Sequence, residues 1–397
     1  MLTVNLALSA MAMLLAFCHC ARGQDANPAK LTPDVLRTSL HLGTQFLLNN
    51  QKPAGNFEYL YDWKRQQYSD QDEPVRQAGV AWGLSLIHAF KPAEEVDTAL
   101  RKALDFMNDR SRLCDDGSRY IVYPGAKRGS AGTVALVALA HIEYLRSRPT
   151  SDPRCQEYQP FLEGYLKYLM RARRDDGQWS AYYDVLTGKP LGDPSPYFDG
   201  EALLALVKAA KYLGFEDWKA ELLASAQAGY ERNVVQARER EPNSPTTKGY
   251  YQWGSMAFYE LAASGWDDTE VFADYVIELA DWVIDIHQNL RRPRNTAYTF
   301  EGILHAYQLA KLRQDQPHLE KFAGVIELGL GKLTSWQVGS PIANAYVRGA
   351  PLDDTRSLGG IQNHASEPLL RIDVAQHQMH AVILTLKYYM ADAVESD

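Results

Sequence analysis

Apolar residues gather in this chain in segments too densely hydrophobic for helices that face solvent. The clearest is the run 202–213, which carries charge only at Lys208 and Lys211. A surface helix shows a polar face, so a helix this apolar is predicted to be buried on nearly all sides. The aromatic and acidic residues 196–201 before it are expected to open onto a central cavity, with Asp199 as a candidate N-cap.

The same apolar pattern recurs along the chain when segments are aligned on their polar first residues. The segment that begins at Glu201 aligns without a gap with the segment that begins at Glu301, and the segment from His377 fits the same frame. Gln252, Thr133 and the pair at 78–79 begin three further copies. Uneven spacing of such copies is typical of repeats with insertions in the loops on one face. The sequence thus predicts six inner helices that begin near positions 78, 133, 201, 252, 301 and 377.

Amphipathic segments separate these apolar ones. Each has apolar residues at three- and four-residue spacing with charges between them, as expected of an outer helix. They cover residues 34–49, 94–107, 158–171, 218–232, 271–287 and 319–333. Because no convincing series of alternating-period strands appears, the pattern predicts an all-α ring of six hairpins, an (α/α)6 toroid with inner and outer helices.

The connections carry a second signature, a glycine-containing turn followed by an aromatic residue. It occurs three times after outer segments, with Phe57, Tyr120 and Trp179 as the aromatics. A glycine turn of this kind commonly ends a helix. In this respect the chain resembles the (α/α)6 toroid proteins, which include six-hairpin glycosidases, polysaccharide lyases and epimerases, and terpenoid cyclase and prenyltransferase barrels.

The resemblance covers essentially the whole mature chain and is architectural. No catalytic motif of one family matches residue by residue, so no functional residue is transferred. The acidic DxDD-type motif of terpenoid cyclases is absent from the sequence, as are the zinc ligands of protein prenyltransferases and lanthionine cyclases. The resemblance therefore implies a fold and a range of activities.

Residues 1–23 have the features of a secretory signal peptide. An apolar core at 6–17 precedes Ala21-Arg22-Gly23, a small-x-small cleavage site. The core is too short to span a bilayer comfortably, and no later stretch is apolar for long enough. We therefore expect an exported protein, periplasmic or secreted, with residues 24–397 as one toroid domain and no membrane span.

Charge and cysteine content narrow the possible partners and cofactors. The net charge is −8, or −9 once Arg22 is removed, which argues against nucleic acid as a partner. Of the four cysteines only Cys114 and Cys155 remain after processing, and in an oxidising compartment they could form a disulfide, with two free thiols as the alternative. Neither cysteine has a ligand at metal-binding spacing, so no metal and no cofactor is expected.

Residues at the aligned helix starts are the candidate catalytic groups, because inner helices of a toroid converge on one mouth. Glu201, Glu301 and His377 would share that cavity and could perform general acid–base catalysis. Acidic residues in a first helical turn also complement the helix dipole, which is the purely structural alternative. His377 and His380 have helical metal-ligand spacing, but no third ligand is adjacent.

Aromatic residues near the loops are expected to floor the cavity and to stack against sugar rings. Tyr197, Trp253 and Tyr298 are the chief candidates. The densest polar stretch, 359–380, adds His364, Arg371 and Asp373 as further substrate-binding candidates, with Asp373 four residues before His377. Among the arginines that could hold a carboxylate or a sulfate are Arg76, Arg128, Arg294 and Arg371.

These features favour an exported enzyme that acts on a polysaccharide or oligosaccharide. Two glutamates would serve hydrolysis, whereas a histidine or tyrosine base with arginine would serve elimination or epimerisation at a uronic acid. Alternatively, the ring is a non-catalytic component of a cell-envelope or export assembly that binds glycan or peptide. A terpenoid-type cyclase is a third reading. The sequence leaves the substrate and the oligomeric state open.

Overall fold

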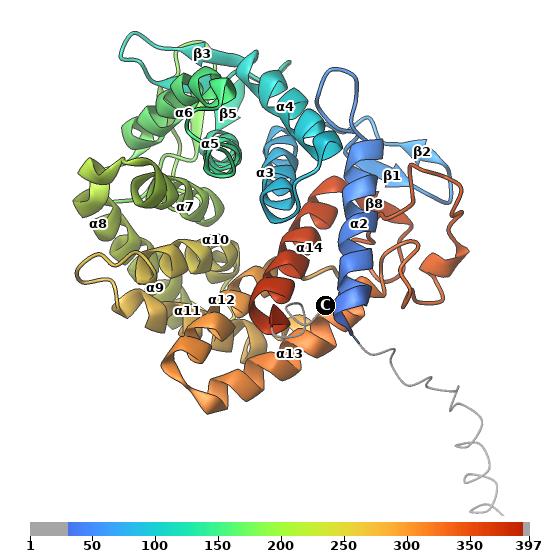
Figure 1. Cartoon of the computed structure of the whole chain (residues 1–397). Coiled ribbons are helices and arrows are strands. Elements are labelled where there is room, and N and C mark those ends of the chain that lie inside the picture. The colour runs from blue at the N-terminus through green and yellow to red at the C-terminus, as the bar shows by residue number, and fades with distance from the viewer. Residues whose placement is uncertain (1–30, 392–397) are drawn as a thin grey trace, which may run out of the picture.

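The computed structural model describes residues 31–391, which form a closed ring of helical hairpins (Figure 1). The inner helices are α3 (Pro74–Phe90), α5 (Ala131–Arg146), α7 (Pro196–Leu213), α10 (Pro245–Ala262), α12 (Ala297–Arg313) and α14 (Ile372–Leu384). The outer helices are α2 (Pro33–Asn49), α4 (Glu94–Asn108), α6 (Pro153–Ala172), α8 (Lys219–Tyr230), α11 (Val271–Asp285) and α13 (Gln316–Thr334). The prediction of an all-α (α/α)6 toroid is confirmed.

The inner helices are buried on nearly all sides, as their composition predicts. In α5 every side chain from Ala131 to Tyr144 is buried, and in α7 the buried stretch runs from Asp199 to Ala210. Each inner helix packs against its inner neighbours, and α14 contacts both α12 and α3. The apolar stripe that an outer helix presents therefore meets an apolar inner layer, and hydrophobic burial holds the two layers together.

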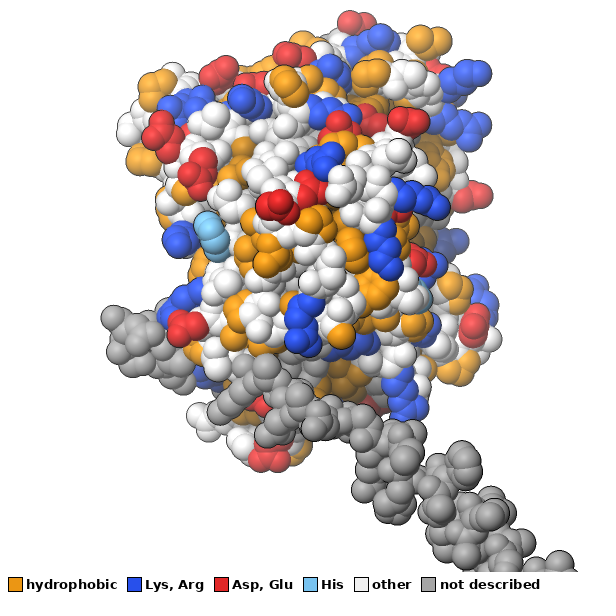
Figure 2. Space-filling view, turned by 90° about the vertical axis from the view of Figure 1, so that its right-hand side faces the viewer, with side chains coloured by type: hydrophobic (Ala, Val, Ile, Leu, Met, Phe, Trp, Pro, Cys, Tyr) orange, Lys and Arg blue, Asp and Glu red, His pale blue; other side chains and the backbone are white. Residues whose placement is uncertain are grey.

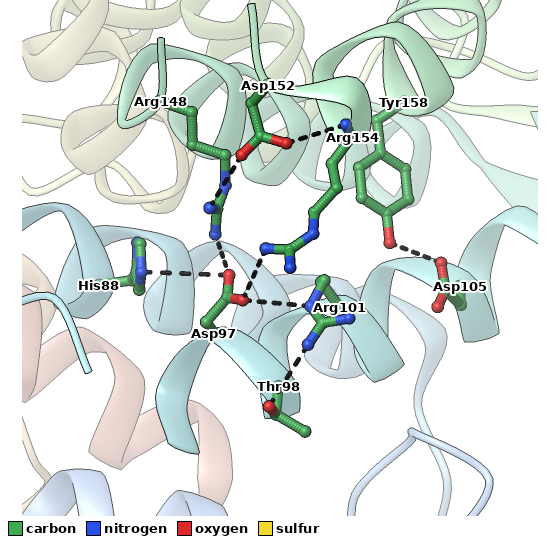
Figure 3. A network of polar contacts seen from close by, with 9 residues as sticks. All are labelled: His88, Asp97, Thr98, Arg101, Asp105, Arg148, Asp152, Arg154 and Tyr158. Carbon is green, nitrogen blue, oxygen red and sulfur yellow. Dashed lines mark hydrogen bonds and ion pairs between the residues drawn. The ribbon is translucent and has the colours of Figure 1, made fainter. Parts of the chain in front are cut away.

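Charged groups join neighbouring outer hairpins at the periphery of the ring. Figure 3 shows the best developed of these networks, around Asp97 on α4. The Asp97 carboxylate accepts hydrogen bonds from Arg101 at 3.1 Å, from Arg154 on α6 at 3.3 Å, and from Arg148 in the α5–α6 connection. Because Asp97 is buried and already has three cationic partners, this network is a structural clamp between α4 and α6.

The inner helices begin earlier than their aligned polar residues suggest. Three of them open with a proline in the first turn, at Pro74, Pro196 and Pro245, because the first turn needs no N–H donor from that position. Ser195, rather than Asp199, occupies the N-cap position of α7, although its side chain makes no capping hydrogen bond, so the expectation for Asp199 is wrong. Asp199 instead lies inside the helix and accepts a hydrogen bond from the Trp179 backbone N–H at 2.9 Å.

The long connections all run from an outer helix to the next inner helix, so they gather at the mouth where the inner helices begin. They hold the short strands of the described chain: β1 (Leu60–Asp62), β2 (Gln67–Tyr68), β3 (Ser111–Leu113), β4 (Arg119–Ile121), β5 (Arg128–Ser130), β6 (Tyr182–Asp184), β7 (Pro190–Leu191) and β8 (Leu369–Arg371). The sheet orders are β2-β1-β8, β3-β4 and β5-β6-β7. We call this end the front mouth and the opposite end the back mouth.

The two ends of the described chain meet and close the ring. Strand β8, directly before α14, pairs antiparallel with β1, and α14 packs against α2 and α3. Figure 1 shows the blue and red segments side by side at this seam.

In residues 31–391 no helix is long and apolar enough to cross a membrane. The signal-peptide expectation concerns residues 1–23, which lie outside the described part of the chain.

The expected disulfide is not formed, and both cysteines are free thiols. The turn that follows Cys114 packs against the C-terminal end of α6, where Arg171 donates to Asp116 at 3.4 Å. Cys155 lies at the other end of that helix, with its thiol 3.6 Å from the Pro149 carbonyl oxygen. The sixteen helical steps from Cys155 to Arg171 span about 24 Å of helix axis, which is far beyond disulfide reach.

Candidate functional site at the front mouth

A polar cavity of about 500 Å³ lies at the front mouth. Its walls come from the first turns of α3, α7, α10, α12 and α14 and from the connections before the last two. We call it the front cavity; its lining includes Arg76, Tyr197, Lys248, Gln252, His287, Arg292, Arg294, Tyr298, Asn363, Arg371, Asp373 and His377. A smaller recess of about 50 Å³ continues it inward and adds Glu201, Trp253 and Gln376. Five of the front-cavity residues also line this inner recess.

Glu301 lies at the centre of a hydrogen-bonded cluster behind the front cavity. Its side chain is fully buried, and one carboxylate oxygen lies 3.3 Å from His377 Nδ1 and 2.9 Å from His380 Nδ1. The other oxygen accepts from the side-chain amide of Gln252. His377 Nδ1 also lies 3.1 Å from the side-chain nitrogen of Gln252. Burial alone would raise the pKa of Glu301, but the two histidines outweigh burial and hold this pKa below its ordinary value. Glu301 is therefore an ionised carboxylate.

Glu301 supports His377 without lining the cavity itself. His377 lines both the front cavity and the inner recess. Since its Nδ1 faces the Glu301 carboxylate, its Nε2 is the nitrogen available to a ligand. His380, one turn further along α14, contacts the same carboxylate from the side of another cavity at the back mouth. The expectation that Glu301 faces the solvent-accessible cavity is corrected by this burial.

Glu201 has an environment of the opposite kind. Its side chain is buried, and its Oε2 atom has no hydrogen-bond partner. Burial raises the pKa of Glu201 to about 8, with only partial opposition from Arg76. Gly132 on α5 makes room for this carboxyl group, because a Cβ at that position would overlap it. Glu201 is thus protonated at neutral pH, and it lines the inner recess beside His377.

Asp373 forms the acidic part of the cavity wall, and two arginines hold it. Arg371 donates two hydrogen bonds to the carboxylate at 2.9 and 2.5 Å, and Arg76 approaches to 3.4 Å. Burial raises the pKa of Asp373, but the two guanidinium groups outweigh it and keep the pKa below its ordinary value. Asp373 is therefore ionised, and its negative charge is neutralised by Arg371 and Arg76.

The predicted aromatic floor is only partly continuous. Trp253 lines the inner recess, 6.1 Å from the His377 ring by centroid and 5.3 Å from Trp82. Tyr197 and Tyr298 line the front cavity on either side of Lys248, whose ammonium lies 5.3 and 5.2 Å from their ring centroids. Lys248 also donates to the Tyr197 hydroxyl at 2.8 Å. The two tyrosines thus form a wall at the entrance, and Trp253 lies deeper.

His364 and Arg128 do not join the cavity lining. His364 forms a β-bridge with Arg294 in the connection before α12, and its Nδ1 contacts the Ser366 hydroxyl at 3.1 Å. Arg128 is exposed in β5, paired in register with Asp184. The sequence analysis passed over two lining cations, Lys248 and Arg292. Lys248 lies one turn before the aligned Gln252, so a repeat frame extended backward would have found it.

Among the residues that the structure describes, five cationic side chains line the front cavity, against one carboxylate. Arg76 and Arg371 are paired with Asp373. Lys248, Arg292 and Arg294 have no carboxylate partner in residues 31–391. These three cations all lie on the α10–α12 side of the cavity. Protonated Glu201 adds no negative charge.

In residues 31–391 no group of three His, Cys, Asp or Glu side chains is placed to hold a metal ion.

Comparison with solved structures finds the same ring architecture in several sugar-processing enzymes. No protein-family model and no curated protein matches the sequence. A sugar epimerase from a ruminal bacterium superposes with a TM-score of 0.64 at 10% identity, over 89% of this chain and 99% of that chain. Cellobiose 2-epimerase from Bacillus thermoamylovorans gives 0.63 at 12% identity, over 88% and 98%.

An unsaturated glucuronyl hydrolase specific for heparin gives a TM-score of 0.60 at 12% identity, over 90% of this chain and 99% of that chain. Identities this low establish the architecture alone. The fold is therefore the (α/α)6 toroid of six-hairpin glycosidases and sugar epimerases.

Proposed function

We propose that the front cavity is the active site of an exported enzyme that acts on an acidic oligosaccharide or polysaccharide. The observation that carries this proposal is the charge balance of the cavity: three cations without a carboxylate partner stand beside a histidine that a buried carboxylate orients. A guanidinium group recognises a carboxylate or a sulfate by paired hydrogen bonds. The lining therefore suits a sugar with an anionic substituent.

His377 and Glu201 are the groups that would move protons. His377 reaches the cavity through Nε2 and is held through Nδ1 by Glu301, the arrangement in which a carboxylate fixes the tautomer of a general base. Glu201 holds a proton at neutral pH and lines the same recess, so it can donate that proton to a leaving oxygen. Glu301 acts through His377 and is a positioning residue.

Elimination or epimerisation at a uronic acid fits this arrangement better than hydrolysis by two carboxylates. Hydrolysis needs both carboxyl groups beside the scissile bond, and Glu301 is fully buried behind His377. Removing the proton beside a sugar carboxylate instead needs one base and cations that stabilise the developing negative charge. His377 and the three unpaired cations supply those two requirements.

One outer face of the molecule (Figure 2) does not show the same excess of one charge. On the face of the molecule seen in Figure 2, basic and acidic side chains are interspersed with hydrophobic ones. The net charge of the chain is negative. An anionic sugar would therefore be attracted to the mouth by local charge and not by the protein as a whole.

The deciding experiment incubates the purified protein with uronate-containing and neutral oligosaccharides and follows the products by mass spectrometry and proton NMR in D₂O. Elimination gives an unsaturated product, epimerisation exchanges a carbon-bound proton for deuterium, and hydrolysis gives new reducing ends. We expect one of the first two with uronates and no turnover of neutral glycans. Hydrolysis of neutral glycans alone would contradict the proposal.

A non-catalytic glycan-binding role is the second candidate, and the exposed ring of Tyr197 at the entrance favours it. Binding of uronate oligosaccharides without any product, abolished by Tyr197→Ala, would establish that role.

Export would be tested by N-terminal sequencing of the protein recovered outside the cytoplasm, with cleavage after Gly23 as the expected result. In the same samples, mass mapping would show whether Cys114 and Cys155 stay reduced.

A further inference from the structure

The back mouth holds a separate cavity of about 680 Å³, larger than the front cavity. The C-terminal halves of the inner helices line it, and the buried cluster around Glu301 separates it from the front cavity. We call it the back cavity. Its volume lies in the range typical of small-molecule sites, and the proposed activity at the front cavity makes no use of it.

Among residues 31–391, the back cavity has more positive than negative side chains. Its carboxylates are Glu143 and Glu260, and its cations are Arg146, Lys208, Lys211 and Lys387. Both carboxylates already have protein partners. Glu143 lies 2.5 Å from Lys208 and 3.1 Å from Arg146. Glu260 lies 2.8 Å from Lys211, 3.2 Å from Lys208 and 2.7 Å from the Tyr212 hydroxyl.

Cationic hydrogen-bond donors remain after these pairs are formed. An ammonium group has three donors, and Lys208 makes two ion pairs, so one donor stays available. Lys387 has no carboxylate partner in residues 31–391, and its ammonium lies 5.6 Å from the centre of the Phe90 ring. Burial, the largest influence, lowers the pKa of Lys387, the Glu143 carboxylate raises it, and repulsion from Lys208 and Arg146 lowers it again. A bound anion would relieve this repulsion.

Neutral polar and aromatic groups complete the lining. His305 Nδ1 contacts the Glu301 backbone carbonyl at 2.5 Å, and burial lowers the pKa of His305 to about 4, so its ring is neutral. Nδ1 therefore carries the hydrogen, and Nε2 is left as an acceptor for a hydroxyl group. The rings of Tyr259 and Tyr388 lie 4.2 and 5.8 Å from the His305 ring by centroid, which gives an apolar face beside that acceptor.

We propose that the back cavity binds a small hydroxylated organic anion of the sugar-acid class. The acidic group would meet Lys387 and the free donor of Lys208, and the hydroxyl groups would meet His305 and the tyrosines. Cations at helix C-termini also complement helix dipoles, but that role does not require a cavity or an unpaired lysine. The proposal holds whether or not the front cavity is catalytic.

Isothermal titration calorimetry of the full chain at low salt tests this proposal, with glucuronate, glucose and inorganic phosphate as probes. We expect two glucuronate sites in the unmodified protein. Lys387→Gln should remove one of them or weaken it at least tenfold, and Arg294→Gln in the front cavity should affect only the other. Lys189→Gln, the same change at a lysine that lines neither cavity, should leave both sites intact.

The three probes also show which chemical class of anion the back cavity binds. Glucuronate binding without glucose binding supports a sugar acid, and tighter binding of phosphate than of glucuronate would overturn that class. Unchanged affinity and stoichiometry in Lys387→Gln, with an unchanged melting curve, would overturn the back-cavity site itself. Equal binding of glucose would overturn the requirement for an anion.

Discussion

The α7 side and the α12 side of the front mouth carry glutamates at equivalent positions of the repeat, yet the two carboxyl groups have opposite charge states. Glu201 is buried with an unpartnered oxygen, and its pKa is about 8. Glu301 is buried among two histidines and a glutamine, and its pKa lies below the ordinary value. The neighbours of each carboxyl group, and not its depth, decide its charge.

This contrast divides the proposed chemistry between the two sides of the cavity. The α7 side offers a carboxylic acid that can donate a proton, and the α12–α14 side offers an imidazole held by a carboxylate. Pairs of titratable groups whose surroundings push their pKa values apart are typical of acid–base active sites. Changing each side separately therefore tests whether the division is functional.

The largest effect is expected on the α12 side. Glu301→Gln removes the charge that orients His377 while it keeps the shape of the side chain, and turnover should fall by about 10²–10⁴-fold. Steady-state kinetics on the substrate found in the screen would measure this. Glu216→Gln, the same change at an exposed position, is the control. If Glu301→Gln kept its turnover within twofold of that of the unmodified protein, Glu301 would have no part in the mechanism.

A smaller loss is expected on the α7 side. Glu201→Gln keeps a neutral group in the recess but removes the acidic proton, so turnover should fall by about 10²-fold. The substrate KM should stay nearly constant, since the amide fills the same space. A variant that loses affinity but keeps its turnover would show that Glu201 only shapes the recess.

The protonated state of Glu201 also predicts how stability depends on pH. Its pKa is about 8 in the folded protein, against 4.5 for an ordinary glutamate, so the folded state keeps a proton that the unfolded chain loses. Stability should therefore decline as pH rises from about 4.5 to about 8, by at most roughly 1.4 kcal/mol for each pH unit in that range.

Glu201→Gln should remove this decline, and the variant should become the more stable protein above neutral pH. Urea unfolding of both proteins between pH 5 and pH 9, followed by circular dichroism, measures the difference. A gap between the two proteins that stays constant over this range would mean that Glu201 is ionised in the fold.

The smallest effect is expected at the entrance on the α12 side. Arg294→Gln removes one unpaired cation from the lining, so KM for a uronate substrate should rise about tenfold with kcat nearly unchanged, as expected for an interaction that is equal in the ground and transition states. Lys189→Gln is again the matched control. The same rise in KM for a neutral substrate would show that Arg294 does not recognise the charge.

The ring could be predicted from the sequence because its signal is periodic and repeated. Six apolar segments fixed the inner layer, and Glu301 and Glu201 were found through their shared frame. Their opposite charge states could not be predicted, since His380 and Gln252 approach Glu301 from two other helices. Asp199 was mistaken for a cap because the Pro196 start of α7 is equally compatible with a loop.

The cysteine prediction failed for a related reason. Cys114 and Cys155 flank one apolar segment in the sequence, which suggested proximity. Sequence separation says nothing about which end of α6 the Cys114 hairpin packs against, and it packs against the far end. Contacts between helix ends are set by the tertiary arrangement and leave no periodic trace in the sequence.

The lining of the front cavity is complete only when the seam between β1 and β8 has closed. Leu60 pairs with Arg371 across most of the chain, and closing so long a loop carries an entropic cost that is recovered only once α14 has docked between α12 and α3. Long-range closure of this kind slows folding. His377, Asp373 and Arg371 all arrive with that final segment. A chain halted before it would leave exposed the sides of α12 and α3 that α14 covers. Under the proposed function, the onset of turnover would therefore report the docking of α14.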